Sequence, residues 1–197
     1  MKTDNRIGNV LLLCCLLLCV PLAAATTDQP LPGDSVYQLP VVLIDQDGKG
    51  FDWRSRRGEP QVVTMFYTSC PYMCPLIIDA GKGIEKSLTA EQREHLHLLF
   101  ISMDPGKDTP AALMDQVKKR QLDTARWTLA SPQEQVVSSV AGVLGVRYRK
   151  LANGDFNHTG ELILLDSDGR ILARTEKIGS KPDPDFLAAV REAIDKS

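Results

Sequence analysis

Residues 62–78 read VVTMFYTSCPYMCPLII, an apolar run that passes directly into two closely spaced cysteines. The first part, residues 62–67, is of strand length and rich in β-forming residues, which is typical of a central strand buried on both faces. After Pro75, apolar residues recur at the spacing of a helix. The sequence therefore places Cys70 and Cys74 at a strand-to-helix junction.

The segments around this junction predict alternating strands and helices. Residues 41–44 and 51–53 enclose a turn-forming segment and indicate an N-terminal β-hairpin. Residues 96–103 form a second strand of buried type, and Thr109 followed by Pro110 is a typical helix start. The remaining expected elements are a strand at 127–130, a helix introduced by a capping box at 131–134 and ended by Gly145, a hairpin at 161–166 and 171–175, and a final helix at about 184–194. This order predicts an α/β, thioredoxin-like fold, in which helices flank a central mixed β-sheet that begins with an N-terminal β-hairpin.

The first 25 residues have the features of a secretory signal peptide. Lys2 and Arg6 give a basic start, an uncharged apolar run of 13 residues covers 10–22, and three alanines end at Ala25. Because a membrane-spanning helix needs about 20 residues, we expect cleavage after Ala25 and export to the periplasm. The alternative is an uncleaved N-terminal helix that anchors the protein in the inner membrane. The predicted organisation is a signal peptide at 1–25, a flexible lead-in at 26–34 and one domain at 35–197.

Cleavage would leave the exported domain with two cysteines, Cys70 and Cys74, in a compartment that oxidises idle thiols. A disulfide between them would close too short a loop to stabilise the fold appreciably. Thiolates at a helix N-terminus attack disulfides and bind soft metals such as copper(I). On one helix their Cβ atoms would be about 5–6 Å apart, which suits a shared metal and needs a modest adjustment for a disulfide. The pair predicts redox or metal chemistry and leaves the choice open.

His158 offers a third ligand. It lies in the loop 153–160, just before the predicted hairpin, so the chain order permits it to face the two cysteines. Two thiolates and one imidazole form a donor set that suits copper, as Cu(I) or Cu(II). A histidine in such a loop is by itself an ordinary surface residue, so this hypothesis depends on the combination with Cys70 and Cys74.

Three segments of the chain resemble signatures of the Sco/SenC family, in the order in which that family has them. Residues 66–75, FYTSCPYMCP, resemble its T-x-C-P-x-x-C-P segment, and residues 101–110, ISMDPGKDTP, resemble a strand that ends in D-P-x-x-D-T-P. His158 and Thr159, followed by a strand and Asp168-Gly169, resemble the third signature, which carries the family's histidine ligand. The three motifs span nearly the whole exported chain.

The resemblance implies a thioredoxin-like fold, copper bound by Cys70, Cys74 and His158, and a role in building the binuclear copper centre of cytochrome c oxidase. The leading hypothesis is a periplasmic copper chaperone that passes copper to an accepting protein such as an oxidase subunit. The alternative is a thiol-disulfide oxidoreductase that uses Cys70 and Cys74 as a redox pair to reduce cysteines of such a target. Many family members have an aspartate before the histidine, whereas this chain has Asn157, so another group must orient the ring.

Charges of both signs are scattered along the chain, and the formal net charge is −2. We therefore expect no nucleic-acid partner. We also expect a monomer that is membrane-proximal at most. Other candidate residues are assigned structural roles. Met73 is expected to pack rather than ligate, His95 and His97 to form a solvated strand entrance, and Asp104 and Asp108 to cap backbone N–H groups. A peroxidase would need an arginine beside Thr68 and a reactive cysteine, and the sequence places none there.

Overall fold

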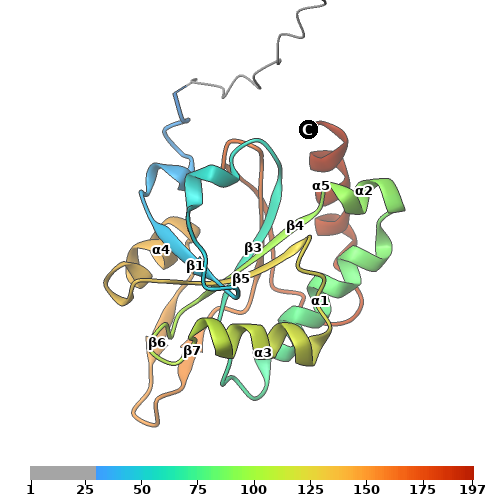
Figure 1. Cartoon of the computed structure of the whole chain (residues 1–197). Helices are drawn as coiled ribbons and strands as arrows, with labels where there is room; N and C mark the ends of the chain where they lie inside the picture. Colours follow the sequence, from blue (N-terminus) through green and yellow to red (C-terminus); the bar gives the residue numbers. More distant parts are fainter. Residues whose placement is uncertain (1–29) are drawn as a thin grey trace, which may run out of the picture. The chain divides into compact units, whose positions relative to one another are not determined.

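A seven-stranded mixed sheet forms the centre of the fold in the computed structural model, which describes residues 30–197 (Figure 1). The predicted signal peptide at 1–25 and the start of the predicted lead-in, 26–29, lie outside the described residues. Within 30–197 no helix is both long and apolar enough to cross a bilayer.

The strands follow the order β2-β1-β5-β4-β3-β8-β9 across the sheet. The three central strands, β3, β4 and β5, are parallel, and an antiparallel hairpin borders them on each side. In chain order the seven strands are β1 (Val42–Asp45), β2 (Gly50–Asp52), β3 (Gln61–Phe66), β4 (His97–Ser102), β5 (Trp127–Pro132), β8 (Leu162–Leu165) and β9 (Ile171–Thr175). The predicted N-terminal hairpin, the central strands and the C-terminal hairpin are thereby confirmed.

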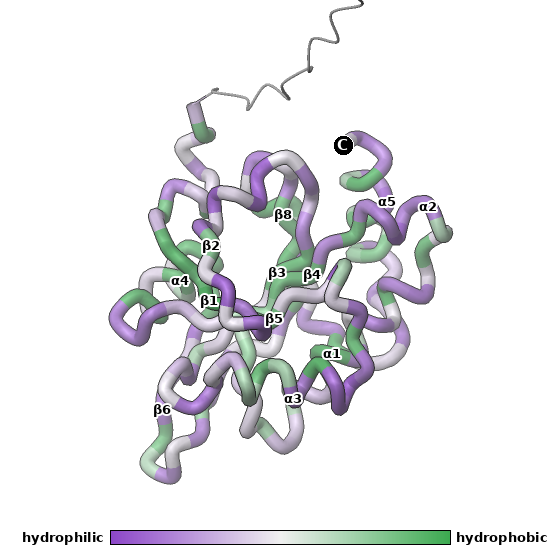
Figure 2. Tube along the Cα trace, viewed as in Figure 1, coloured by the Kyte–Doolittle hydropathy of each residue, from purple (hydrophilic) through white to green (hydrophobic). Residues whose placement is uncertain are grey.

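The centre of the sheet is apolar on both faces. All six residues of β3 are buried, as are five of the six in β4 and all of β5 and β8. Figure 2 shows β3, β4 and β8 as largely hydrophobic segments inside the domain. A strand covered on both faces needs no alternation of polar and apolar residues, which explains the continuous apolar run in β3.

Helices cover both faces of this sheet. Helix α1 (Met73–Ser87) connects β3 to β4 and α3 (Pro110–Arg120) connects β4 to β5, so right-handed crossovers place both on one face. The Lys82 ammonium of α1 donates to the Arg120 carbonyl at the end of α3, at 2.8 Å. Figure 1 shows α4 on the other side of the sheet. The remaining helices are α2 (Ala90–Glu94), α4 (Val137–Leu144) and α5 (Pro184–Asp195), and single 3-10 turns occur at Val36–Gln38, Trp53–Arg56 and Glu134–Val136.

Helix α1 lies very close to the sheet because Gly81 has no side chain. A Cβ atom at Gly81 would lie 2.6 Å from the Trp127 ring and 3.0 Å from Leu98 Cδ2. Such separations are below van der Waals contact, so a larger residue would push α1 away from β4 and β5. The glycine therefore fixes the height of α1 above the sheet, and with it the position of Cys74 in the first turn.

One predicted helix start is wrong. Residues 131–134 form no capping box, because β5 continues through Ser131 and Pro132 and pairs with β1. The Ser131 hydroxyl donates instead to the Asp108 carbonyl at 2.7 Å. Helix α4 begins later, at Val137, without a side-chain cap, and ends at Gly145 as predicted, where φ is +69°.

Three short elements have no counterpart in the sequence prediction. They are helix α2 and the strands β6 (Tyr148–Lys150) and β7 (Phe156–His158), which pair antiparallel as a separate two-stranded ribbon. The ribbon strands have three residues each, and only Phe156 among them is buried, so they are too short and too polar to show the apolar alternation that marks a strand.

Candidate metal centre

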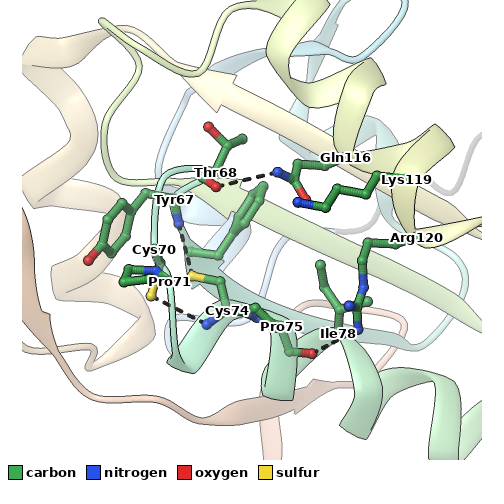
Figure 3. A pocket seen from close by; sticks show the side chains of 11 residues that line it. Tyr67, Thr68, Cys70, Pro71, Cys74, Pro75, Ile78, Gln116, Lys119 and Arg120 are labelled. Atoms are coloured by element: carbon green, nitrogen blue, oxygen red, sulfur yellow. Dashed lines mark hydrogen bonds between the residues drawn. The ribbon is translucent and has the colours of Figure 1, made fainter.

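The two cysteines lie where β3 passes into α1. Cys70 is in the loop before the helix, and Cys74 is in the first helical turn. The Tyr67 N–H donates to Cys74 Sγ, and the Cys74 N–H donates to Cys70 Sγ, each at 3.4 Å (Figure 3). Because Cys70 precedes the helix, the spacing expected for two cysteines on one helix does not apply. Each sulfur atom instead accepts one backbone N–H, and the N–H that Cys70 accepts is at the N-terminus of α1, where negative charge is favoured.

The two thiols differ in environment and in acidity. Cys74 is buried, whereas Cys70 is half-buried. Hydrogen bonding from the Cys74 thiol, assisted by backbone N–H groups, lowers the pKa of Cys70 to about 4. Hydrogen bonding to Cys70, together with burial, raises the pKa of Cys74 well above its ordinary value. In the reduced, metal-free pair, Cys70 is therefore the thiolate and Cys74 holds the proton.

His158 completes a group of three potential ligands. One ring nitrogen of His158 and the sulfur atoms of Cys70 and Cys74 all lie within 4.8 Å of one another. The sequence placed His158 in a loop, but it is the last residue of β7 and pairs with Tyr148 of β6. The ribbon carries it to the cysteines. Among residues 30–197 no other cluster of three His, Cys, Asp or Glu side chains has this character.

A backbone carbonyl orients the imidazole. His158 Nδ1 lies 3.1 Å from the Thr159 carbonyl oxygen, so a proton on Nδ1 can be donated to that oxygen. This assignment leaves the lone pair of Nε2 for a metal ion. The Thr159 main-chain carbonyl therefore orients the ring in this chain, which has Asn157 where many family members have an aspartate.

Tyr67 attaches the ribbon to the end of β3. Its ring is 3% exposed and packs edge-on against Phe156, at a centroid distance of 5.1 Å, and against His158, at 5.9 Å. The Phe156 N–H donates to the Tyr67 hydroxyl at 3.4 Å, and burial raises the pKa of Tyr67 to about 12. Tyr67 therefore acts as a neutral spacer that sets the distance between the cysteine loop and β7.

A second contact joins the ribbon to the first turn of α1. A Cβ atom at Gly160 would lie 2.9 Å from Met73 Cγ and 3.0 Å from Met73 Sδ. Met73 is 38% exposed and thus packs against Gly160, as expected for a methionine that fills space. The contact leaves no room for a larger residue at position 160.

The Asp108 carboxylate holds the start of the cysteine loop in place by hydrogen bonds. Its carboxylate is 1% exposed and accepts hydrogen bonds from the Thr68 N–H (3.1 Å), the Thr68 hydroxyl (2.5 Å) and the Ser102 hydroxyl (2.6 Å). Burial raises the pKa of Asp108 despite these hydrogen bonds. As expected, Asp108 accepts a backbone N–H, but this N–H belongs to Thr68 of the cysteine loop, and the Thr109 hydroxyl caps α3 by accepting the Ala112 N–H.

The other residues considered from the sequence lie apart from the three ligands or are otherwise engaged. His95 is exposed, and His97 contacts the Glu59 carboxylate at the entrance to β4. Asp104 is buried and lies 3.4 Å from the Lys107 ammonium.

Sequence reasoning missed an arginine near the thiols. Arg120 lines a pocket of about 140 Å³ together with Thr68, Cys70 and Cys74 (Figure 3). Its guanidinium donates to the Pro75 carbonyl at 3.2 Å and pairs with Asp79. Since the Thr68 hydroxyl is also engaged, by Asp108, the two groups that a peroxidase would direct at its substrate are used to hold the structure. Arg120 is 46 residues beyond Cys74, and no local pattern in the sequence connects them.

The sequence pattern of the SCO1/SenC family matches residues 31–195. The chain belongs to this family. A SCO2-like protein of Rickettsia prowazekii is 27% identical over 190 residues, covering 87% of this chain and 91% of its own. The solved structure of Bradyrhizobium japonicum ScoI with copper bound is 25% identical, with a TM-score of 0.66, and covers 79% of this chain and 98% of ScoI.

The fold is that of other Sco proteins, so the predicted thioredoxin-like class is confirmed. BsSco, a member of the Sco family of cytochrome c oxidase assembly proteins in which a disulfide switch is identified, superimposes with a TM-score of 0.68 at 22% identity, over 81% of this chain and 94% of BsSco. Copper, the metal expected from the sequence, is the metal of solved Sco relatives, and this chain brings together two thiols and an imidazole of the kind that bind it.

Proposed function

We propose that this Sco-family protein binds one copper ion through Cys70, Cys74 and His158 and passes it to a copper-accepting protein of the cell envelope, a cytochrome c oxidase subunit that carries the binuclear copper centre. The observation that carries the proposal is the convergence of the three ligand atoms within 4.8 Å of one another. Relatives support it, since B. japonicum ScoI is solved with copper and BsSco is a cytochrome c oxidase assembly protein.

The donor set fits both the binding and the release of copper. Thiolates favour copper(I), and imidazole suits either oxidation state. Buried Cys74 would give up its proton when the metal binds, which makes binding depend on pH. Cys70 and His158 are half-buried, so an incoming ligand can approach the metal from the solvent side and replace them one at a time.

We further propose that the protein acts in the periplasm after removal of residues 1–25. The basic start, the short apolar run and the three alanines support this location. N-terminal sequencing of the protein recovered from the periplasmic fraction tests the site of cleavage. A mature chain beginning at Thr26 is expected, and a full-length chain in the inner membrane would favour the anchored alternative.

One observation favours a second function, thiol-disulfide exchange. The unequal acidity of the cysteines suits a nucleophile and a resolving thiol. The Cys70 thiolate would attack a target disulfide and release one target thiolate. Cys74 would then lose its proton, attack the mixed disulfide and release the second target thiol, leaving a Cys70–Cys74 disulfide. Two electrons pass from the pair to the target.

Anaerobic copper titration of the reduced domain tests the first function. We expect stoichiometric binding with a thiolate-to-copper(II) absorption band that disappears in Cys70→Ser and Cys74→Ser and weakens strongly in His158→Ala. The matched control is His95→Ala, which removes an exposed histidine away from the three ligands. Full copper binding by His158→Ala would overturn the site.

The same variants separate the two functions. Reduction of a disulfide-bonded dicysteine peptide requires Cys70 and Cys74 but not the imidazole. If the protein is a copper chaperone, His158→Ala should lose copper affinity. If it is a reductase, His158→Ala should keep the wild-type rate of peptide reduction. If wild-type protein reduces the peptide and binds no copper, thiol-disulfide exchange replaces copper transfer as the assigned function.

A further inference from the structure

Cationic side chains lie on both sides of the thiol pair. Lys119 and Arg120 of α3 line the pocket on one side of the pair. On the other side, two arginines line the hollow next to His158, namely Arg149 in β6 and Arg147 just before it. The carboxylates that line the hollows around the thiols are those of Asp155 and Glu176. We call Lys119, Arg120, Arg147 and Arg149 the cationic collar. The collar is a local excess of positive charge on a chain whose formal net charge is −2.

Most of the collar is not used to stabilise the fold. Lys119, Arg147 and Arg149 are exposed, and none lies within ion-pair distance of a carboxylate in the part of the chain that the structure describes. Arg120 differs, because Asp79 and the Pro75 carbonyl hold it in place. The three exposed cations are therefore available to carboxylates of another molecule.

Apolar side chains stand exposed between the two halves of the collar. Tyr72, between the cysteines in sequence, is 81% exposed, Met73 is 38% exposed and Leu151 is 36% exposed. All three line the same hollow as Cys70 and His158. Exposed aromatic residues beside arginines are typical of the centre of a protein–protein interface.

The negative charge of the reacting groups explains what the cationic collar would do. A thiol reacts with a metal ion or with a disulfide as its thiolate, so the groups that meet at this site carry negative charge when they react. Two such groups repel each other as they approach, and nearby cations offset this repulsion. Cations around the site also speed the encounter with an acidic partner.

We propose that the face formed by Tyr72, Met73, Leu151 and the cationic collar docks an acidic segment of a partner protein, in which carboxylates flank the copper-accepting or disulfide-forming residues. The inference rests on the proposed function, because it names the kind of partner that the metal centre meets. The segment's apolar side chains would cover Tyr72, while its carboxylates would pair with Lys119 on one side and Arg147 and Arg149 on the other.

Direct binding of labelled peptides tests the surface without copper or redox chemistry. The probe is a fluorescein-labelled peptide with two serines in place of a C-x-x-x-C pair and two glutamates on each side, and the comparison peptide has lysines in place of the glutamates. By fluorescence anisotropy at low salt we expect the acidic peptide to bind about tenfold more tightly than the basic one. The preference should fall to less than about threefold at 0.5 M salt, where charges are screened.

Charge reversal locates the binding surface. The triple variant K119E/R147E/R149E should bind the acidic peptide about tenfold more weakly, whereas K49E/K86E/K181E should bind it as wild type does. The control reverses three exposed lysines, none of which lines a hollow at the thiol pair. Retained binding by the collar variant, an equal loss in the control, or equal affinity of wild type for both peptides would overturn the proposal.

Two further measurements distinguish the docking of an acidic segment from copper binding and from lipid binding. Copper titration of the collar variant should match wild type, so a failure of copper binding would show in that experiment and not in the serine peptides. Phosphatidylglycerol vesicles serve as a competitor. If the vesicles bind through the collar and the peptides show no preference, the surface is a lipid-binding one and the acidic-partner proposal is wrong.

Discussion

His158 Nδ1 lies 3.1 Å from the carbonyl oxygen of the residue that follows it, Thr159. This contact ties the orientation of a candidate metal ligand to the backbone at the end of β7 rather than to a neighbouring side chain. Asn157, where many Sco proteins have an aspartate, is exposed. Asn157 lines the same hollow as Cys70 and His158, but among residues 30–197 its side chain makes no hydrogen bond to the imidazole.

We therefore predict that Asn157→Asp and Asn157→Ala each change copper affinity by less than about fivefold, the range of a weakly coupled surface charge. Loss of a side chain that orients a metal-binding histidine typically costs about 10- to 100-fold. Competition titration with a copper chelator measures the difference, and His158→Ala provides the reference for a lost ligand. A tenfold or greater loss in Asn157→Ala would show that this side chain orients the ring.

Removing the Asp108 carboxylate should destabilise the cysteine loop. Asp108→Ala leaves the half-buried Thr68 donors and the buried Ser102 hydroxyl without an acceptor, at a cost of about 2–4 kcal/mol in the free energy of unfolding. Asp108→Asn keeps an acceptor and should cost about 1 kcal/mol. Urea unfolding of the reduced, metal-free protein measures both. Asp115→Ala, which removes an exposed carboxylate of α3, is the control and should be near neutral.

The pH dependence of this difference has a definite sign. Because burial raises the pKa of Asp108 in the folded state, the proton stabilises the fold below the carboxyl's ordinary pKa, and that contribution is lost as the pH rises. Asparagine does not titrate. The deficit of Asp108→Asn relative to wild type should therefore be larger at acidic than at neutral pH, and a deficit that grows toward neutral pH would contradict the assignment.

The central part of this fold could be predicted because its signals are local. The uninterrupted apolar run at 62–67 indicates a strand buried on both faces, and Thr109 followed by Pro110 indicates a helix start. The two cysteines directly after the apolar run indicate the strand-to-helix junction. The capping box at 131–134 failed for a tertiary reason. Pairing with β1 and the hydrogen bond from Ser131 to Asp108 hold that segment as strand, which overrides its local preference.

The half of the site that no local pattern places depends on contacts between distant segments. Cys70 and Cys74 follow from a local pattern, whereas His158 follows only from its combination with them and from the family resemblance, because the three-residue strand that carries it is too short to be recognised. Its position is set by Tyr67 against Phe156 and by Met73 against Gly160, pairs 89 and 87 residues apart. Arg120 of α3, whose guanidinium donates to the Pro75 carbonyl in the first turn of α1, could not be predicted for the same reason.

The acidity of Cys70 gives a prediction for the reduced, metal-free protein. With a pKa of about 4, Cys70 is a thiolate throughout the range from about pH 5 to 8, so its alkylation rate by iodoacetamide should be nearly constant there. An ordinary thiol, with a pKa of about 8.5, would slow about tenfold for each pH unit below that value. Trapping followed by mass spectrometry distinguishes Cys70 from the unreactive Cys74.

Cys74→Ala is the diagnostic variant for this effect. It removes the thiol that donates to Cys70, which is the largest cause of the lowered pKa, and should make the alkylation of Cys70 depend on pH again. The sign for stability follows. Because the folded pKa lies below the unfolded one, ionisation of Cys70 stabilises the fold above the ordinary thiol pKa, and this contribution is lost as the pH falls toward about 4. A steep pH dependence of alkylation in the wild type would refute the assignment.

The contact between Gly160 and Met73 predicts a coupled pair of substitutions. A methyl group at Gly160 would lie 2.9 Å from Met73 Cγ, so Gly160→Ala must displace either the methionine or the ribbon that carries His158. We expect a loss of about 1–2 kcal/mol in the free energy of unfolding, typical of overpacking, and weaker copper binding. The double variant M73A/G160A removes the obstacle and should recover both, giving a coupling energy of about 1 kcal/mol in a double-mutant cycle. Gly179→Ala, where a Cβ atom would meet nothing within 4 Å, is the matched control. If Gly160→Ala loses copper affinity and M73A/G160A does not recover it, the ribbon is held against α1 by something other than this contact.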